Sequence, residues 1–257
     1  MKDKAVIITG AANGLGRVAG IAAAKAGYSV LLVDIDEIGL AESKQMIEEN
    51  GGVAETYKAN VADEAEVKGY VDFAVEKFGR IDGFFNNAGI LGVPSLITDT
   101  DVEVLDRVLA VNVRGVFLGL KHVLKVMINQ GSGSIVNTGS MGSTGGLPYT
   151  ASYTASKHAV IGLTKTAALE NAPTGVRVNA VLPGTIKTQM ALKGTPGNTE
   201  EEKVAFASKT VPQGQMGTPE DIANAVVFLF SDGAKHITGI EVPVDGGITA
   251  QVYPSYA

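Results

Sequence analysis

A tyrosine and a lysine four residues apart are the side chains of this sequence best placed to do chemistry. If their segment is helical, Tyr153 and Lys157 share one face, because residues i and i+4 project from the same side. A phenol loses its proton near pH ~10, and a neighbouring cation favours the phenolate, so we expect Lys157 to lower the pKa of Tyr153 toward neutrality. Such a tyrosine can protonate a carbonyl oxygen or accept the proton of an alcohol. The same spacing is common on solvated helix surfaces, so the pair alone leaves both interpretations open.

The composition is that of a globular α/β protein. The 257 residues are 45% hydrophobic and 19% charged, and the formal net charge is -6. This charge argues against a general affinity for nucleic acid or anionic lipid. Cysteine is absent, which excludes disulfides, cysteine nucleophiles and thiolate-ligated zinc. The three histidines are scattered and have no ligand spacing, so we expect no metal site.

The sequence contains no long apolar segment. No stretch reaches the ~18 uninterrupted apolar residues that a membrane helix needs, and the apolar run after Lys4 is too short for a signal sequence. We therefore expect a soluble cytoplasmic protein without a membrane partner.

Short β-rich runs alternate with longer helical patterns. This alternation predicts a single domain over residues 1–257, with a Rossmann-type, doubly wound, mostly parallel seven-stranded sheet and helices on both faces. The expected strands are Ala5–Thr9, Tyr28–Val33, Val53–Lys58, Gly83–Phe85, Ser134–Asn137, Val176–Leu182 and Ile240–Val244. The expected helices are Leu15–Ala26, Asp36–Asn50, Glu64–Phe78, Val102–Asn129, Ser152–Asn171 and Pro219–Phe230. The irregular segment 185–216, with a helical pattern at Thr199–Ser208, is either a substrate lid or a surface insertion.

The turn between the first strand and the first helix is rich in glycine. It reads Thr9-Gly10-Ala11-Ala12-Asn13-Gly14-Leu15-Gly16. Glycines permit a tight turn and a close approach of the backbone to a pyrophosphate at a helix N-terminus. Any tight strand-to-helix turn can use glycine, but its place after the first strand favours dinucleotide binding by Gly10, Asn13, Gly14, Leu15 and Gly16.

Asp34 ends the second expected strand, eighteen residues after Gly16. An acidic side chain at about this offset accepts hydrogen bonds from the adenosine ribose hydroxyls. It would also repel the 2′-phosphate of NADP, so we expect NAD as cofactor. Asp34 could instead cap the next helix, a role that Asp36 could also fill. Arg17 could supply a cation for a phosphate, but it lies one step into the helix.

Taken together, these motifs resemble the compact single-domain branch of the short-chain dehydrogenase/reductase family over essentially the whole chain. The resemblance includes the glycine turn, Tyr153-x-x-x-Lys157 and the further motifs Asn86-Asn87-Ala88-Gly89, Asn112, Ser140 and Pro183-Gly184, in the family's order and spacing. Extended-type relatives are longer and have a different glycine spacing. Divergent enoyl reductases typically place the tyrosine and the lysine further apart.

The resemblance implies a role for each matching residue. Tyr153 would be the general acid/base, Lys157 would hold the nicotinamide ribose, Ser140 would bind the substrate oxygen, and Asn112 would position a water that links Lys157 to solvent. Further cofactor contacts are implied for Asn60, Val61, Asn87, Ala88, Gly89, Pro183, Gly184, Ile186 and Thr188. Many relatives have aspartate where this chain has Asn60. Structural alternatives remain: Asn86-Asn87 could stabilise a turn, Ser140 could cap a helix, and Asn112 could be a satisfied buried amide.

The leading interpretation is an NAD-dependent enzyme that interconverts a secondary alcohol and a ketone. The expected substrate pocket is apolar, which favours a neutral, small-to-medium cyclic or branched substrate; it comprises Ile90, Leu91, Met141, Gly142, Leu147, Tyr149, Met190 and Leu192. The segment Asp245–Gln251 looks like that of relatives acting on alicyclic alcohols, diols or cyclic diketones. One alternative is a 3-oxoacyl-thioester (acyl carrier protein) reductase, which Asp34 disfavours because most of those prefer NADPH. Another is a dinucleotide-binding regulator without catalysis, which the complete set of four catalytic positions disfavours.

The resemblance also implies an assembly. The helical patterns Val102–Asn129 and Ser152–Asn171 resemble the pair that forms a four-helix dimer contact in the family. The C-terminal residues Val252, Tyr253, Pro254 and Tyr256 are apolar for a free tail. We therefore expect a homotetramer with two-fold symmetry.

Overall fold

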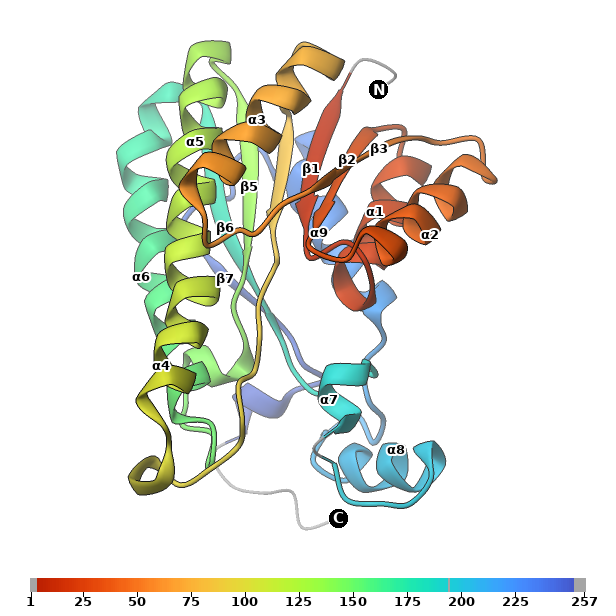
Figure 1. Cartoon of the computed structure of the whole chain (residues 1–257), viewed down its shortest axis with the longest axis vertical. Coiled ribbons are helices and arrows are strands. Elements are labelled where there is room, and N and C mark those ends of the chain that lie inside the picture. The colour runs from red at the N-terminus through yellow and green to blue at the C-terminus, as the bar shows by residue number, and fades with distance from the viewer. Residues whose placement is uncertain (1–3, 194, 252–257) are drawn as a thin grey trace.

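A seven-stranded parallel sheet forms the centre of the computed structural model, which describes residues 4–193 and 195–251 (Figure 1). The strand order is β3-β2-β1-β4-β5-β6-β7, and every neighbouring pair is parallel. This confirms the predicted doubly wound fold. The strands are β1 (Ala5–Thr9), β2 (Ser29–Asp34), β3 (Val53–Lys58), β4 (Gly83–Asn86), β5 (Gly133–Thr138), β6 (Val176–Pro183) and β7 (Glu241–Val244).

The strand order reverses between β1 and β4, and this reversal places the functional end of the sheet. After β1 the chain moves outward through β2 and β3, and it then returns to add β4 on the other side of β1. In open α/β sheets the connections at such a point leave in opposite directions, and ligands bind in the crevice beyond the carboxyl ends of the strands. The glycine turn after β1 and the Asn86-Asn87 segment after β4 therefore meet at the same edge.

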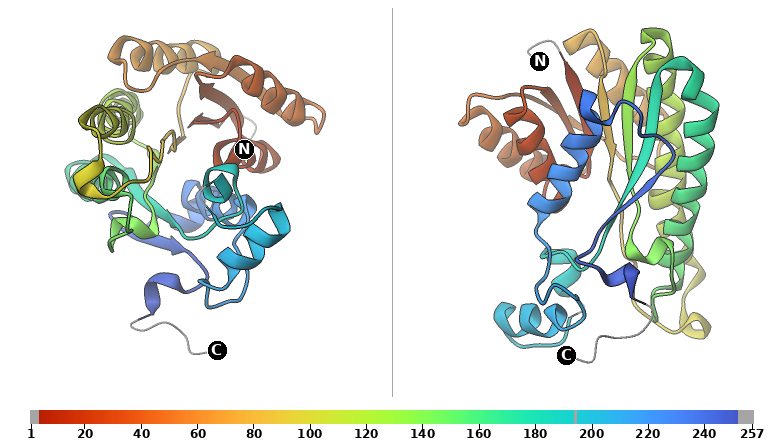
Figure 2. Two further views of the ribbon diagram at one scale, coloured as in Figure 1. Left: turned by 60° about the horizontal axis from the view of Figure 1, so that its bottom comes forward. Right: turned by 180° about the vertical axis from the view of Figure 1, so that it is seen from behind.

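Helices cover both faces of the sheet (Figure 1). One apolar core joins the sheet to α1, α2 and α9, and a second joins its other face to α3, α5 and α6. Seen from behind in Figure 2, α9 lies along its face of the sheet, on the side opposite α5 and α6. The helices on these faces are α1 (Gly14–Lys25), α2 (Glu37–Glu48), α3 (Glu64–Phe78), α5 (Gly115–Gln130), α6 (Ala151–Asn171) and α9 (Pro219–Phe230).

The segment Val102–Asn129 is helical throughout, as its pattern predicts, but one of its turns is not α-helical. Helix α4 (Val102–Leu109) and helix α5 are joined by a π-helical turn, Ala110–Arg114. A π turn inserts one extra residue and often marks a functional site. The periodicity of apolar residues does not reveal it, because its cause is a tertiary contact: the turn contains Asn112, which is fully buried.

Two short helices project beyond the carboxyl end of the sheet, at the bottom of Figure 1. Helix α7 (Gln189–Lys193) is an element that the sequence did not predict, and α8 (Glu200–Ser208) begins after Thr199, whose hydroxyl accepts from the Glu202 amide at 3.2 Å. Both lie within the segment 185–216. Within the described residues, no helix is long and apolar enough to cross a membrane.

Candidate active site

Tyr153 and Lys157 lie in the first two turns of α6 and share one face, as predicted. The Lys157 Nζ atom is 5.5 Å from the centroid of the Tyr153 ring. Lys157 is only 3% exposed, although lysine is almost never fully buried without a partner. A buried ammonium beside a phenol is therefore built into the fold, and the interpretation as a solvated helix surface is wrong.

Burial dominates the proton affinities of both groups. Burial raises the pKa of Tyr153 above its ordinary value, and a hydrogen bond with Ser140 opposes this rise. Burial also lowers the pKa of Lys157 to about 8. The prediction that Lys157 lowers the pKa of Tyr153 toward neutrality is wrong for this fold, because desolvation penalises the phenolate and Ser140 supplies the opposing effect.

The Lys157 ammonium is held by one backbone group. Its Nζ donates to the carbonyl oxygen of Thr138, at the end of β5, at 2.7 Å. An ammonium has three N–H donors. Since this is its one hydrogen bond among the described residues, two donors are left for a partner that the chain does not supply. A diol such as a ribose offers oxygen acceptors at the spacing that two such donors require.

Ser140 follows β5 and begins a short turn that binds α6. Its Oγ accepts from the Gly142 amide at 3.1 Å, so the predicted capping alternative is correct as far as it goes. The Ser140 amide donates to Ser143 Oγ at 3.0 Å, and Ser143 Oγ donates to the Lys157 carbonyl at 3.0 Å. The serine turn is thus fixed to the helix that carries Tyr153, and the Ser140 hydroxyl both caps the turn and interacts with the phenol.

Asn112 links the loop after β4 to α6. Its Oδ1 accepts from the Ile90 amide at 2.9 Å, and its Nδ2 donates to the Ile90 carbonyl at 2.9 Å and to Ser156 Oγ at 3.0 Å. Ser156 Oγ donates in turn to the Tyr153 carbonyl at 2.6 Å. A buried amide with all these bonds is structurally satisfied, and the bonds also place it beside the Tyr153 turn.

The glycine turn after β1 has the geometry that a bound pyrophosphate requires. Gly10 has φ +67°, and a β-carbon there would lie 2.9 Å from Asn87 Nδ2. A β-carbon on Gly16 would lie 2.0 Å from the Gly10 carbonyl oxygen, so the first turn of α1 packs directly on the loop. At Gly14 (φ +52°) the same position meets no atom within 4 Å, so the backbone is open on that side. These residues therefore fit a dinucleotide phosphate at the α1 N-terminus.

The loops after β1 and β4 are bound to each other. Thr9 Oγ1 accepts from the amides of Asn87 and Ala88 at 2.9 and 3.0 Å. Asn87 Nδ2 donates to the Thr9 carbonyl at 2.9 Å, and Thr138 Oγ1 donates to Asn87 Oδ1 at 3.1 Å. These bonds fix Ala88 and Gly89 beside Lys157, because a β-carbon on Gly89 would lie 3.6 Å from Lys157 Nζ.

Asp34 lies at the cofactor end and does not cap α2. Asp36 caps that helix, because its Oδ1 accepts from the Ile38 and Gly39 amides, each at 3.1 Å. The Asp34 carboxylate instead accepts from the Ala12 amide in the glycine turn at 3.0 Å and from the Ile35 amide at 2.7 Å. Asp36, and not Asp34, is therefore the cap of α2, and the Asp34 carboxylate lies against the glycine turn.

Arg17 is committed to the packing of α1 on α2. Its Nε donates to Ser43 Oγ at 2.9 Å, and its Nη2 contacts the Ala12 carbonyl and Glu42 Oε2, the latter at 2.7 Å. A carboxylate therefore already pairs with the one cation that the sequence offered for a 2′-phosphate.

The remaining cofactor positions lie at the same edge of the sheet. Asn60 follows β3, and its Oδ1 accepts from the Ala62 amide at 3.0 Å, while Val61 is buried beside it. After β6, Pro183 and Gly184 pack against the segment after β7, since a β-carbon on Gly184 would lie 2.5 Å from Asp245 Cβ. Ile186 is buried, and Thr188 Oγ1 accepts from the Ala191 amide at 3.3 Å and so caps α7.

The expected substrate residues come from three loops and from α7. Ile90 and Leu91 follow the cofactor loop, and Met141 and Gly142 follow Ser140. Leu147 packs on Gly142, where a β-carbon would lie 2.8 Å from Leu147 Cδ1. Tyr149 and Met190 are exposed.

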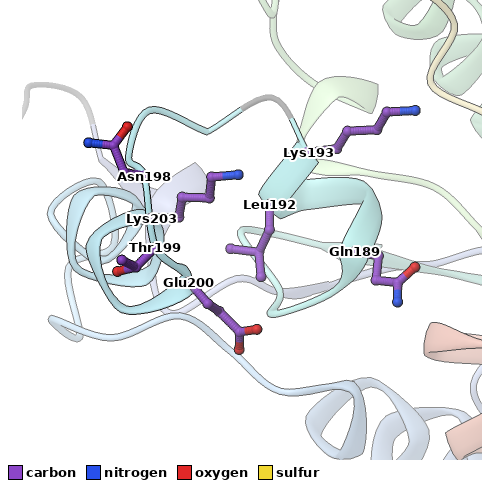
Figure 3. A pocket seen from close by; sticks show the side chains of 7 residues that line it. All are labelled: Gln189, Leu192, Lys193, Asn198, Thr199, Glu200 and Lys203. Carbon is purple, nitrogen blue, oxygen red and sulfur yellow. The ribbon is translucent and has the colours of Figure 1, made fainter.

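Leu192 lies on α7, on the side that faces α8. Figure 3 shows it pointing from α7 into the space between α7 and α8, where it lines a cavity of about 270 Å³ with Lys203 and Glu200. Gln189 and Lys193, also on α7, line the same cavity.

Sequence reasoning missed several polar residues that position the site. The Thr9 hydroxyl, the Thr138 carbonyl and the Ser156 hydroxyl each bind a residue that was predicted. Thr9 belongs to the Thr-Gly motif and Ser156 to the Tyr-x-x-Ser-Lys motif. Their positions within these motifs could have identified them. Thr138 acts through its backbone, and no side-chain pattern could have identified it.

Comparison with known proteins identifies relatives over nearly the whole chain. A family model described as enoyl-(acyl carrier protein) reductase matches residues 10–249. The chain is 42% identical to levodione reductase of Leifsonia aquatica, over 96% of this chain and 95% of the relative. It is 38% identical to cyclohexanol dehydrogenase of Acinetobacter sp. (strain SE19), over 97% of this chain and 96% of the relative. It is 39% identical to 3-oxoacyl-(acyl-carrier-protein) reductase of Thermotoga maritima, over 96% of this chain and 98% of the relative.

Solved structures show the same fold. The crystal structure of levodione reductase has a TM-score of 0.94 at 41% identity, covering 98% of this chain and 100% of that one. NAD+-bound xylitol dehydrogenase has a TM-score of 0.89 at 35% identity, with 96% and 99% covered. Actinorhodin polyketide ketoreductase with NADPH has a TM-score of 0.92 at 33% identity, with 98% and 99% covered. The fold therefore serves relatives that carry either cofactor.

Proposed function

The chain belongs to the short-chain dehydrogenase/reductase family, and we propose that it interconverts a secondary alcohol and a ketone with NAD(H). The observation that carries this proposal is the placement of three groups at one end of α6. They are a half-buried phenol, a serine hydroxyl in contact with it, and a buried ammonium 5.5 Å from the phenol ring. Such a site can bind one oxygen atom and move one proton to or from it.

Tyr153 and Ser140 have different roles in the proton transfer. In ketone reduction the Tyr153 hydroxyl gives its proton to the substrate oxygen, and in alcohol oxidation the Tyr153 phenolate accepts that proton. Its raised pKa keeps it protonated at neutral pH, which is the form that gives the proton in reduction. The Ser140 hydroxyl binds the same oxygen and stabilises the charge that develops on it. When bound, the nicotinamide supplies or accepts the hydride.

Lys157 and Asn112 support Tyr153. The two free N–H donors of Lys157 would hold the nicotinamide ribose hydroxyls next to the Tyr153 ring. Asn112 fixes the Ile90 backbone and Ser156, and so orients the turn of α6 that carries Tyr153. A water held near Asn112 would complete a proton path from Lys157 to solvent.

We infer NAD rather than NADP as the carrier. Asp34 would accept from both adenosine ribose hydroxyls and repel a 2′-phosphate. Arg17 supports the same choice, because its guanidinium already pairs with Glu42. The glycine turn, Asn60, Val61, Asn87, Ala88 and Gly89, together with Pro183, Gly184, Ile186 and Thr188, would complete the cofactor site.

The proposed substrate is neutral and carries a ring or a branch. The residues expected around the substrate oxygen are apolar, and the relatives named for levodione and cyclohexanol point to cyclic compounds. Segment 185–216 would act as a lid over this site. The 3-oxoacyl-thioester reductase of Thermotoga maritima, at 39% identity, keeps that activity as the second candidate.

A homotetramer is the proposed assembly. Phe117 on α5 is 50% exposed and Leu169 on α6 is 79% exposed, so each helix presents a large apolar side chain to its surroundings. Burial of such residues between copies of the chain would stabilise an isologous contact. The apolar C-terminal residues Val252, Tyr253, Pro254 and Tyr256 lie outside the described residues. Light scattering at micromolar concentration should give four times the chain mass; a monomer would contradict the proposal.

The function is tested by a substrate and cofactor panel. NADH and NADPH oxidation should be followed with cyclic ketones, linear ketones and a 3-oxoacyl thioester, and the reverse reaction with the matching alcohols. The proposal expects the highest kcat/KM with NADH and a cyclic ketone. A preference for NADPH and the thioester would favour the second candidate, and cofactor binding without turnover of any substrate would indicate a regulator.

A further inference from the structure

Tyr149 has a backbone conformation that its side chain disfavours. Its φ is +65°, and it is the one non-glycine residue with positive φ among residues 4–193 and 195–251. In the left-handed region the β-carbon of an L-residue crowds the following carbonyl, so glycine or asparagine is usual there. Strain of this kind persists only where the surrounding structure enforces it, and it concentrates at functional sites.

The strain arises in a tight turn with proline at its second position. The turn runs from Leu147 to Thr150, and the Thr150 amide donates to the Leu147 carbonyl at 3.3 Å. With Pro148 second and a positive φ at the third position, it has the character of a type II turn, in which the third residue is normally glycine. Burial does not compensate for a tyrosine there, because its side chain is 60% exposed.

Three contacts hold this turn next to the catalytic groups. On one side Leu147 packs on Gly142, two residues after Ser140. On the other side Thr150 Oγ1 lies 3.2 Å from Thr154 Oγ1, one residue after Tyr153. From the loop after β4, the Ser95 amide donates to the Tyr149 carbonyl at 2.9 Å. The backbone of Tyr149 is therefore fixed where the loops around the substrate site meet.

The neighbouring side chains make this rim apolar. Val93 and Leu96, on either side of the Ser95 anchor, are 62% and 55% exposed. Ile90 and Leu91 precede them in the same loop, and the Ile90 backbone is hydrogen-bonded to Asn112. An exposed aromatic ring on a rigid backbone provides a large apolar contact area with little loss of conformational entropy on binding.

We propose that Tyr149 is a specificity-determining residue whose ring contacts the cyclic part of the substrate while Tyr153 and Ser140 hold its oxygen. The inference rests on the proposed function and deepens it by naming the substrate class: ketones and secondary alcohols whose reacting carbon belongs to, or is attached to, an alicyclic or aromatic ring. A face of the phenol offers such a ring stacking or C–H contacts, which a short linear chain uses less. This contact explains why tyrosine occupies a position where glycine would be unstrained.

The test compares Tyr149→Gly and Tyr149→Phe with the wild-type enzyme on cyclohexanone and on the linear ketone 2-butanone. In Tyr149→Gly we expect KM for cyclohexanone to rise about 10-fold, with kcat within about 3-fold and KM for 2-butanone and NADH nearly unchanged. Its melting temperature should be equal to or above that of the wild type, because glycine tolerates this φ. Tyr149→Phe should behave as the wild type, since it keeps the ring.

Several outcomes would overturn the proposal. An unchanged KM for cyclohexanone in Tyr149→Gly would show that the ring does not contact the substrate. An equal rise for both ketones would assign the turn a role in loop integrity only, and a fall in oligomeric mass would place the ring between copies of the chain. If the wild-type enzyme turns over neither ketone, the proposed function fails too; wild-type turnover with an unaffected glycine variant rejects only the role of Tyr149.

Discussion

The side chain of Asn112 binds both polar groups of the Ile90 backbone. Its Oδ1 accepts from the Ile90 amide and its Nδ2 donates to the Ile90 carbonyl, each at 2.9 Å. Nδ2 also donates to Ser156 Oγ at 3.0 Å. One buried amide in a π turn thus connects the loop after β4 to the turn of α6 that carries Tyr153.

Replacement of Asn112 by alanine should therefore impair both folding and catalysis. The variant leaves the part-buried Ile90 amide and carbonyl without their partner, and a fully buried unsatisfied group costs about 1–3 kcal/mol. We expect a loss of about 2–4 kcal/mol in the free energy of unfolding, measured by urea denaturation, and a fall of at least about 10-fold in kcat.

Asn171→Ala provides the matched control. Asn171 is also a buried amide of the catalytic helix, but it lies at the far end of α6 and donates to the Ala167 carbonyl at 2.8 Å. This variant should lose stability and keep kcat. If both variants lowered kcat equally, the role of Asn112 would be structural and not specific to the site.

Asp34 should control the choice between NAD and NADP. In Asp34→Asn the charge that repels a 2′-phosphate is lost, while an oxygen remains to accept from the Ala12 amide. A charge pair a few ångströms apart near a protein surface is worth about 1–4 kcal/mol. We therefore expect the ratio of kcat/KM for NADP to that for NAD to rise about 10- to 100-fold.

Asp36→Asn removes the same charge two residues away. Asparagine caps a helix as well as aspartate does, so α2 should be retained. The cofactor ratio should change little in this variant. A similar shift in both variants would mean that net charge, and not the position of Asp34, selects the cofactor.

Much of this architecture could be predicted from the sequence because it follows local patterns. The bounds of β1, β3, α3 and α9 agree with their apolar and capping patterns to the residue. The π turn at Ala110–Arg114 could not be predicted from the local pattern, since its buried Asn112 bonds with a loop that is distant in sequence.

The site was predictable in its side chains but not in its electrostatics. The motifs located Tyr153, Lys157, Ser140 and Asp34, whereas the roles of Asp34 and Asp36 separated only once hydrogen bonds were known. The expected fall in the pKa of Tyr153 failed because the spacing shows the cation and does not show the depth of burial. The strained turn at Tyr149 was equally hidden, since φ follows from tertiary contacts.

The buried ammonium should make stability depend on pH. Burial lowers the pKa of Lys157 from 10.5 to about 8. Between these values the unfolded chain binds the proton and the folded chain does not, so the free energy of unfolding rises with pH. Below pH 8 both states carry the proton, and the full cost of burying the charge is present.

This dependence should vanish in Lys157→Met, measured without cofactor. Relative to that variant, the wild type should gain up to about 3 kcal/mol between pH 8 and 10.5, at about 1.4 kcal/mol per pH unit. Loss of the hydrogen bond to Thr138 changes the free energy of unfolding of the variant by an amount that does not depend on pH. Lys125→Met, at an exposed position of α5, should track the wild type across the range; parallel curves for all three proteins would show that Lys157 keeps an ordinary pKa.

Removal of the Ser140 hydroxyl should raise the pKa of Tyr153 further. The hydrogen bond with Ser140 is what lowers this pKa against the effect of burial. In Ser140→Ala the limb of the pH–rate profile that reports Tyr153 should move to higher pH, and kcat/KM should fall about 100-fold with the loss of one oxyanion donor. Thr144→Ala, on the same turn but exposed, should leave both unchanged. A fall in rate without a shift of the limb would mean that Ser140 binds substrate but does not tune the phenol.

The central claim is that the Tyr153 hydroxyl transfers the proton, and Tyr153→Phe tests it most directly. The variant keeps the ring beside Lys157 and removes only the hydroxyl. The experiment measures kcat for cyclohexanone reduction in the variant and the wild type. It also measures the Kd of both proteins for NADH by fluorescence titration. We predict that kcat falls at least about 1,000-fold while the Kd for NADH changes less than about 3-fold. Turnover within 10-fold of the wild type, with NADH bound normally, would contradict the account.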